Sequence, residues 1–350
     1  MKRTYIGGQA VLEGVMMKGP ESYALAVRKP DKEIEVKVTE YISFGEKHKG
    51  CRLPLVRGVV NFVESLYIGM KTLMDSSEYF EEEENAGASA KTKGGTSDKV
   101  SSEKIEAVQN SSEETGYGKR ETDKKDSGKK ESDKKESDGN AGYLIGTLII
   151  SLIIAIGIFM LLPAFVANLL YKVTSSSLIV NVFEGLFRLA IFIGYVAVIS
   201  FMEDIKRTFM YHGAEHKTIN CLEAGDDLTV ENVRKHTRFH KRCGTSFVFI
   251  VMIISIFVFM FVHTKVLWLR LLSRIVLIPV IAGISYEVIR YAGKYQNVLS
   301  NILSAPGLWV QRLTTKEPDD DMIEVAIRSV EGVIDWHEYV DCVRNNSFEK

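Results

Sequence analysis

Residues 211–247 read YHGAEHKTINCLEAGDDLTVENVRKHTRFHKRCGTSF. The stretch holds four of the seven histidines of the chain, in two pairs with members four residues apart: His212 with His216, and His236 with His240. On a helix this spacing puts both imidazoles of a pair on one face, and it is the spacing with which a helix offers two nitrogens to one metal ion. Because apolar segments of membrane-spanning length lie on both sides, the stretch predicts a metal site at a membrane surface.

A candidate catalytic residue lies between the histidines of the first pair. Glu215 completes H-x-x-E-H, the inverted zinc-protease motif, in which the glutamate is a general base and not a ligand. Bound Zn²⁺ lowers the pKa of its water to near 7, and such a site needs three protein ligands and one open position. Candidates for the third ligand are His236, His240, Cys243 and Glu223, and residue type and pairing favour the two histidines. If all of them bind, the site is closed and structural, or it holds two metals.

The two pairs are expected on two helices that form a cytoplasmic hairpin. Helix-forming residues continue to Gly225, a plausible end of the first helix. A second helix is predicted to begin near Thr229 and to carry His236 and His240 towards Cys243. A single H-x-x-E-H motif is weak evidence, because helices with two surface histidines are common. Two pairs, a cysteine and a glutamate in one short loop are harder to obtain from composition alone.

Hydropathy predicts a polytopic α-helical membrane protein. Four apolar segments approach the ~20 residues that cross a ~30 Å hydrocarbon core: residues 144–162, 178–201, 246–262 and 275–291. The loop after the second span is rich in lysine and arginine, which places it and both termini in the cytoplasm. The outer stretch around VLWLRLL departs from this rule, since it carries Lys265, Arg270 and Arg274, and we expect it to form an interfacial amphipathic helix.

The composition of the chain indicates its cellular compartment and the kind of partner it binds. The net charge is −1 with no basic excess, so the lipid bilayer is the expected partner and nucleic acid is not. The four cysteines form no C-x-x-C pair, which favours a reducing compartment. The N-terminus has a basic start but no apolar core of signal-peptide length. Together with the spans, these features predict a multi-pass protein of the cell membrane.

Six regions follow from the pattern of composition. We expect an N-terminal cytoplasmic β/α unit (1–80), a disordered charged linker (81–142), two transmembrane helices (143–201), the metal-site hairpin (202–245), two more transmembrane helices (246–293) and a C-terminal cytoplasmic helical segment (294–350). The β strands are expected within residues 4–40, where EIEVKVTEY alternates apolar and charged residues, Gly19-Pro20 marks a turn and Gly7-Gly8 suggests a tight turn or close backbone approach. The C-terminal segment is expected to contain an amphipathic docking helix whose apolar side carries Ile323, Ala326, Val330 and Val333. A helix after Pro54 has an apolar stripe, which we expect to pack against the β unit rather than on the membrane; its residues are Val59, Phe62, Val63, Leu66, Met70 and Leu73.

Three acidic residues lie in apolar surroundings. Glu184 is four residues before Arg188, so a structural ion pair within the second span is the first interpretation. Glu287, near the inner end of the fourth span, is equally compatible with a site residue and with a partner of Arg290. Glu13 lies in the run AVLEGVMM, where an edge-strand position facing solvent is the expected role.

Several segments in order resemble one family: GGQAVLEGVMMKGP, YHGAEHKTI, HKRCGTSF, SYEVIRYAGK and TTKEPDDDMIEVAI. Together they are similar to the DUF1385 family of YqhQ-like bacterial membrane proteins, over nearly all the chain except about 81–142. The resemblance implies a polytopic membrane protein, described as a predicted metal-dependent enzyme of unknown substrate. It implies a site at His212, Glu215, His216 and the segment from His240 to Cys243. The charged linker departs from the family pattern and suggests a dispensable insertion.

The sequence therefore favours a membrane-embedded hydrolase that uses a divalent metal, Zn²⁺ first, with Glu215 as base and a membrane protein or lipid as substrate. The alternative is a non-catalytic scaffold or assembly factor with a structural metal or histidine cluster. A di-iron oxygenase needs more histidines than the chain offers. A transporter lined by Glu184, Arg188 and Glu287 has little room in four spans.

Overall fold

A computed structural model describes residues 6–93, 146–147, 149–262, 264, 266–295 and 297–348. The chain divides into two compact units, Met1–Asn85 with Phe159–Lys350, and Ala86–Ile158. The sheet and the candidate site both belong to the first unit. Of the predicted linker, residues 81–93 continue a helix that starts in the first unit, whereas 94–142 lie outside the described residues.

The N-terminal β unit is a four-stranded antiparallel sheet in the order β1-β2-β3-β4, which confirms strands within residues 4–40. The strands are β1 (Gly7–Val11), β2 (Gly14–Lys18), β3 (Ser22–Arg28) and β4 (Ile34–Glu40). The five central residues of β3 are buried, because both faces of the sheet are covered. β4 alternates partly buried and exposed residues, as expected for an edge strand with one solvated face.

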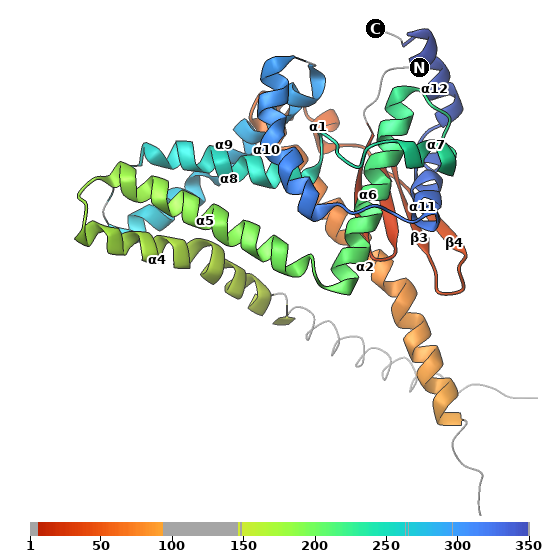
Figure 1. Ribbon diagram of the computed structural model, residues 1–350, viewed down its shortest axis with the longest axis horizontal. Coiled ribbons are helices and arrows are strands. Elements are labelled where there is room, and N and C mark those ends of the chain that lie inside the picture. Colours follow the sequence, from red (N-terminus) through yellow and green to blue (C-terminus); the bar gives the residue numbers. More distant parts are fainter. Residues whose placement is uncertain are drawn as a thin grey trace, which may run out of the picture. The chain divides into compact units, whose positions relative to one another are not determined.

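One face of the sheet packs on helices from the second half of the chain (Figure 1). Helix α6 (Glu203–Ala224) lies against β1 and β2, and α11 (Asp320–Glu331) lies against β2, β3 and α6. Val15 and Met17 of the sheet share a core with Ile219 of α6 and Ile323 of α11. The C-terminal helix predicted from its apolar stripe therefore docks on the sheet. Further elements are α1 (Phe44–Lys47), η1 (Lys49–Arg52), α7 (Val230–Lys235), α10 (Val298–Thr314) and α12 (Trp336–Asn345).

Helix α2 (Val56–Lys93) covers the opposite face, where Ile68 joins the core of Val11, Met16 and Leu25. The prediction that its apolar stripe packs inward is wrong: Val63, Leu66, Met70 and Leu73 are 45–58% exposed. The buried side instead carries small residues that allow close approach. A Cβ at Gly69 would lie 2.3 Å from the side-chain Oε1 of Gln9 on β1.

Among the described residues, three helices are long and apolar enough to cross a membrane, which supports a membrane-embedded protein. They are Ile149–Lys172, α5 (Ser177–Ile199) and Trp268–Lys294 within α9 (Leu267–Lys294). The segment predicted as a further span forms α8 (Gly244–Met260), an apolar helix of 17 residues. The first helix also differs from expectation, because it continues past Pro163: a π-turn (η2, Gly157–Leu161) precedes α4 (Leu162–Leu169), which leads into η3 (Leu170–Lys172).

Glu184 of α5 pairs with Arg188 at 3.1 Å, as predicted. It also contacts Arg270 and Arg274 of α9, whose side chains are 1% and 5% exposed. These two arginines are two of the three charges that departed from the positive-inside pattern; the third, Lys265, lies outside the described residues. They lie inside the bundle beside an acid, so they are not charges of an external loop, and α9 begins at Leu267 in place of the expected interfacial helix.

The other two acids also pair with arginines. Glu287 of α9 accepts a hydrogen bond from Arg57 of α2, with 2.6 Å between Oε1 and Nε. The Nη1 of Arg290 is farther away, at 3.9 Å from the Oε2 of Glu287. Glu13, in the β1–β2 turn, pairs with Arg207 of α6 at 2.6 Å. These contacts join α2 to α9 and the sheet to α6, which favours structural roles for both acids.

Candidate metal centre

The first histidine pair lies on α6, one turn apart, as the spacing predicted. His212, Glu215 and His216 are all buried, with exposures of 8%, 4% and 0%. The helix ends at Gly225, which adopts a left-handed backbone (φ 80°) as a C-terminal glycine commonly does. Gly213, between the histidines, lets the segment after α10 cross α6 closely, because a Cβ there would lie 2.0 Å from the carbonyl oxygen of Lys316.

Backbone carbonyls fix the tautomer of both rings. The Nδ1 of His212 lies 2.8 Å from the carbonyl oxygen of Thr314, and the Nδ1 of His216 lies 2.6 Å from that of Arg238. Since a carbonyl only accepts, each Nδ1 carries a proton, and in the neutral form of each ring the Nε2 keeps its lone pair. The Nε2 of His216 is buried and has no hydrogen-bond partner among the described residues. Both histidines thus present the nitrogen that a metal binds, oriented by bonds at the other nitrogen.

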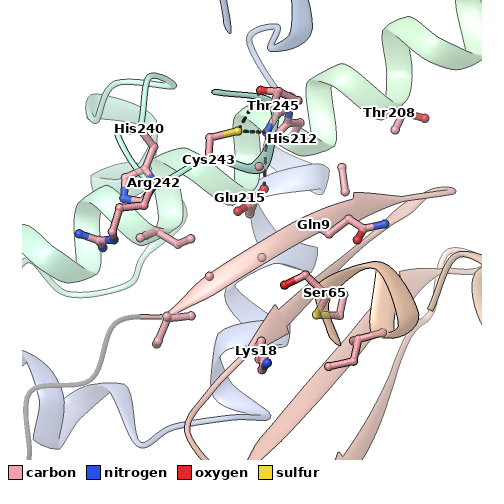
Figure 2. A pocket seen from close by; sticks show the side chains of 18 of the residues that line it. Gln9, Lys18, Ser65, Thr208, His212, Glu215, His240, Arg242, Cys243 and Thr245 are labelled. Atoms are coloured by element: carbon pink, nitrogen blue, oxygen red, sulfur yellow. Dashed lines mark hydrogen bonds and ion pairs between the residues drawn. The ribbon is translucent and has the colours of Figure 1, made fainter. Parts of the chain in front are cut away.

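Cys243 completes the group (Figure 2). Its Sγ lies 3.1 Å from the Nε2 of His212 and 3.0 Å from the Oγ1 of Thr245. One ligand atom from each of His212, His216 and Cys243 lies within 4.8 Å of the other two. The Oε2 of Glu215 lies 3.9 Å from the Nε2 of His212. Two imidazole nitrogens and a sulfur therefore converge beside a carboxylate.

The charges in the group shift one another's pKa values. Burial raises the pKa of the Cys243 thiol, but His212 and His216 outweigh it and hold that pKa well below its usual range. Burial lowers the pKa of His212, yet Cys243 and Glu215 together raise it to about 9. Burial raises the pKa of Glu215 despite the opposing effect of both histidines. Cys243 also lies at the N-terminus of α8, where backbone N–H groups favour a thiolate.

The second pair does not lie on a helix, so the predicted helix through His236 and His240 is wrong. Helix α7 ends at Lys235, and the chain from His236 to Cys243 is irregular. The loop's carbonyl groups bond to side chains of α6 instead of forming helix bonds. Asn220 donates to the carbonyl oxygens of residues 237 and 239 at 2.7 and 3.1 Å, in addition to the His216 bond to residue 238.

The two loop histidines have separate partners. The Nε2 of His236 lies 2.9 Å from the Oδ2 of Asp226 and is not part of the group around Cys243. His240 is nearer: its ring centroid is 5.5 Å from that of His216, and its Nε2 lies 3.8 Å from the Oε2 of Glu223. Glu223 also pairs with Arg242. The geometry therefore offers Cys243 as the third ligand, although residue type had favoured His240 and His236.

Residues outside the central stretch position the site, and sequence reasoning missed them. Gln311 of α10 is fully buried; its amide accepts from the N–H of His240 at 2.9 Å and donates to the His240 carbonyl at 2.7 Å. Gly8 of β1 faces the catalytic candidate, since a Cβ there would lie 2.8 Å from the Cγ of Glu215. The glycine pair GGQAV was a signal for close backbone approach, but its partner was not apparent.

A cavity of about 670 Å³ opens onto the group. His212, Glu215 and Cys243 line one side, and the β1 strand lines the other (Figure 2). Two imidazole nitrogens and a thiolate are a donor set that suits Zn²⁺. A metal would take the place of a proton on the Nε2 of His212 and would give the buried Nε2 of His216 the partner it lacks. The residues present therefore fit a metal with three protein ligands.

Comparison with known proteins identifies the family. The DUF1385 family, described as a protein of unknown function, matches residues 53–336. The chain belongs to the DUF1385 family. It is 35% identical over 333 residues to the uncharacterized protein YqhQ of Bacillus subtilis (strain 168), covering 92% of this chain and 90% of that protein. No solved structure matches.

The DUF1385 match includes every residue of the metal-ligand group. His212, His216 and Cys243 lie within residues 53–336, as do Glu215 and the orienting Thr314. The β sheet precedes the matched region. The family description names no activity.

Proposed function

We propose that the protein is a membrane-embedded metal-dependent hydrolase, in which His212, His216 and Cys243 bind one Zn²⁺ and Glu215 is the general base. One observation carries the proposal. The buried Nε2 of His216 has no partner among the described residues and converges with the Nε2 of His212 and the Sγ of Cys243 next to a buried carboxylate. An unpaired buried nitrogen costs free energy, and a metal removes that cost.

The metal would polarise the scissile carbonyl and make its bound water acidic near neutral pH. Glu215 would accept the proton of the attacking water and return it to the leaving group. Its pKa, raised by burial, suits that exchange, because a general base works best when its pKa approaches the working pH. The carbonyls of Thr314 and Arg238 would keep both imidazoles oriented throughout.

The alternative is a non-catalytic scaffold whose metal only stabilises the fold. Structural zinc sites almost always have four protein ligands, whereas catalytic sites keep one position open. Within the described residues the converging group has three members and borders a cavity, which favours the catalytic interpretation.

The test begins with metal content. Full-length protein purified in detergent is analysed by inductively coupled plasma mass spectrometry, together with His216→Ala, Cys243→Ser and Glu215→Gln. We expect about one zinc per chain in the unchanged protein and in Glu215→Gln, and loss of zinc from the two ligand variants. Absence of metal from the unchanged protein contradicts the proposal.

The second measurement is hydrolysis of a panel of fluorogenic peptide amides and carboxylic esters. We expect Glu215→Gln to keep its metal and lose at least about 100-fold in kcat, the range of a general base. If Glu215→Gln retains both metal and activity, the carboxylate is not the base. If metal is bound but no substrate of the panel is hydrolysed, the scaffold alternative is favoured.

A further inference from the structure

We propose that the cavity binds a polypeptide segment in extended conformation, which pairs as an additional strand with the free edge of β1. This inference rests on the proposed hydrolase and names its substrate class as protein. It is carried by the hydrogen-bond register of the sheet, by the course of the cavity and by the position of Glu215 above β1.

The register shows which backbone groups of β1 remain available. The N–H of Gly19 bonds to the carbonyl of Ser22, and that of Arg28 bonds to the carbonyl of Glu13, so odd-numbered residues of β2 bond towards β3. Even-numbered residues of β2 therefore bond towards β1, where they pair with residues 7, 9 and 11. The N–H and C=O groups of Gly8 and Ala10 must point away from the sheet.

Those groups have no partner in the part of the chain that the structure describes. β1 is at the end of the strand order, so it has a neighbouring strand on one side only. No hydrogen bond of the Gly8 or Ala10 backbone to another element is present among the described residues. Such an edge is a template for an incoming strand, and natural folds usually cover or block it. Here the edge lines a cavity instead.

The cavity runs along this edge and is lined by residues from both faces of the sheet. Ala10 packs with the core on the α6 face, whereas Met16 packs with Ile68 on the α2 face. Residues from both faces nevertheless line the same cavity, together with the β1 residues 7–10. The space therefore passes along the outer edge of β1, where a strand about 4.8 Å away would lie. Its volume of about 670 Å³ is within the range of ligand pockets.

Glycine brings this edge next to the catalytic candidate. Because a Cβ at Gly8 would lie 2.9 Å from the Oε1 of Glu215, only glycine allows the strand to lie so close to the carboxylate. A chain paired with the outward groups of Gly8 and Ala10 would carry its peptide bonds past Glu215 and the converging ligand atoms. This is the recognition mode in which main-chain bonds supply affinity.

The chemistry of the lining favours a peptide over a lipid. An acyl chain would cover the free N–H and C=O groups of the edge without bonding to them, at a cost of roughly 1–3 kcal/mol for each group. A peptide backbone offers alternating donors and acceptors at matching spacing. The polar side chains of Gln9, Ser65, Thr208 and Thr245 at the cavity wall add hydrogen-bonding capacity that a peptide can use.

The test uses full-length Glu215→Gln protein in detergent, so that binding is measured without turnover. The probe is a pool of fluorescein-labelled random decapeptides, followed by fluorescence anisotropy and competed with palmitoyl-oleoyl-phosphatidylglycerol added as mixed micelles in the same detergent. The best-binding peptide is then resynthesised with a single N-methyl group at each amide in turn. We expect methylation to weaken binding at least about tenfold at alternate amides and little at those between, since one edge of a strand pairs through every second residue.

A proline variant tests the protein side of the same contact. Ala10→Pro removes one outward N–H of β1 and leaves the β1–β2 bonds intact. Val38→Pro is the matched control, because Val38 is 53% exposed on the opposite edge strand β4 and does not line the cavity. We expect weaker peptide binding for Ala10→Pro only. The N-methyl scan keeps the inference testable if Ala10→Pro does not fold.

The outcomes separate this inference from the proposed function. If the protein hydrolyses esters or lipids with dependence on Glu215 but binds no peptide, the hydrolase proposal stands and the strand-pairing inference is wrong. Uniform effects of N-methylation along the peptide also contradict it. If peptides bind with alternating dependence on N-methylation and no hydrolysis is found, strand pairing stands and the hydrolase proposal fails.

Discussion

Two stretches of this protein carry the same types of candidate ligand in the same order, but they have different structures. Residues 212–221 carry a histidine pair at i,i+4 followed by Cys221, and residues 236–243 carry a pair at the same spacing followed by Cys243. In the first stretch the pair lies on a helix and the cysteine faces the core. In the second the pair lies in a loop and the cysteine meets the histidines of the first.

The difference teaches that spacing has meaning only on a regular backbone. On α6 four residues return the chain to the same face, so His212 and His216 are neighbours, with ring centroids 4.4 Å apart. In the loop, the backbone carbonyl groups bond to side chains of α6, and His236 and His240 contact different acids.

The largest contrast is expected between the two cysteines. Burial raises the pKa of Cys221 to about 12, so at pH 7 only about one in 10⁵ molecules carries that thiolate. The pKa of Cys243 lies well below its usual range, so its thiolate is present at neutral pH, and the cysteine lines the cavity. In protein freed of metal with a chelator, we expect iodoacetamide to label Cys243 at pH 7 at least about 1000-fold faster than Cys221, as followed by peptide mass spectrometry.

The sign of the pH dependence follows from these shifts. Labelling of Cys243 should fall as the pH is lowered through its depressed pKa, whereas labelling of Cys221 should still rise above pH 10. Added Zn²⁺ should protect Cys243 and leave Cys221 unchanged. Equal labelling of the two cysteines at pH 7 would show that the imidazoles do not stabilise a thiolate.

The second contrast is between the histidine pairs as metal ligands. We expect His216→Ala to lower zinc affinity more than about 100-fold, since even the partners that orient a ligand contribute 10–100-fold. His240→Ala should change the affinity by less than about tenfold, because its Nε2 faces Glu223 and not the converging group. Competition with a fluorescent zinc chelator measures both. A larger loss of zinc affinity for His240→Ala would show that His240 is itself a metal ligand.

The third prediction concerns the side chain that holds the loop of the second stretch in place. The loop depends on Gln311, which bonds both backbone groups of His240 and the hydroxyl of Ser246. Gln311→Ala leaves buried groups unpaired, and we expect a loss of about 2 kcal/mol in the free energy of unfolding. The exposed neighbour Arg312 provides the control, Arg312→Gln. Thermal unfolding in detergent should separate the variants, and equal melting temperatures would contradict this role of Gln311.

The smallest effect is expected at His236. Its partner Asp226 has a side chain that is 55% exposed, and such ion pairs contribute about 0–1 kcal/mol. His236→Gln should therefore leave both zinc content and the melting temperature nearly unchanged. A loss of bound zinc from this variant would show that the loop rearranges to bring His236 to the metal.

Much of the fold was predictable because it is local. Period-two alternation and Gly-Pro turns marked the sheet, long apolar runs marked the three membrane-length helices, and the stripe with Ile323 marked the docking helix α11. The stripe on α2 misled, because periodicity identifies an apolar face and does not say what that face meets. The helix predicted through His240 failed because contacts with α6 replaced its own hydrogen bonds.

By itself the sequence determined which residues share a face of α6: His212, Glu215 and His216 follow from helical geometry alone. Only the tertiary structure decided that Cys243 joins them, that carbonyls of Arg238 and Thr314 orient the rings, and that Gly8 of β1 lies over the carboxylate. The physical reason is the range of the interactions. A helical turn is set by neighbours four residues apart. The other contacts join residues that are at least 22 positions apart in the sequence, and 102 in the case of His212 and Thr314, so packing of the whole chain selects them.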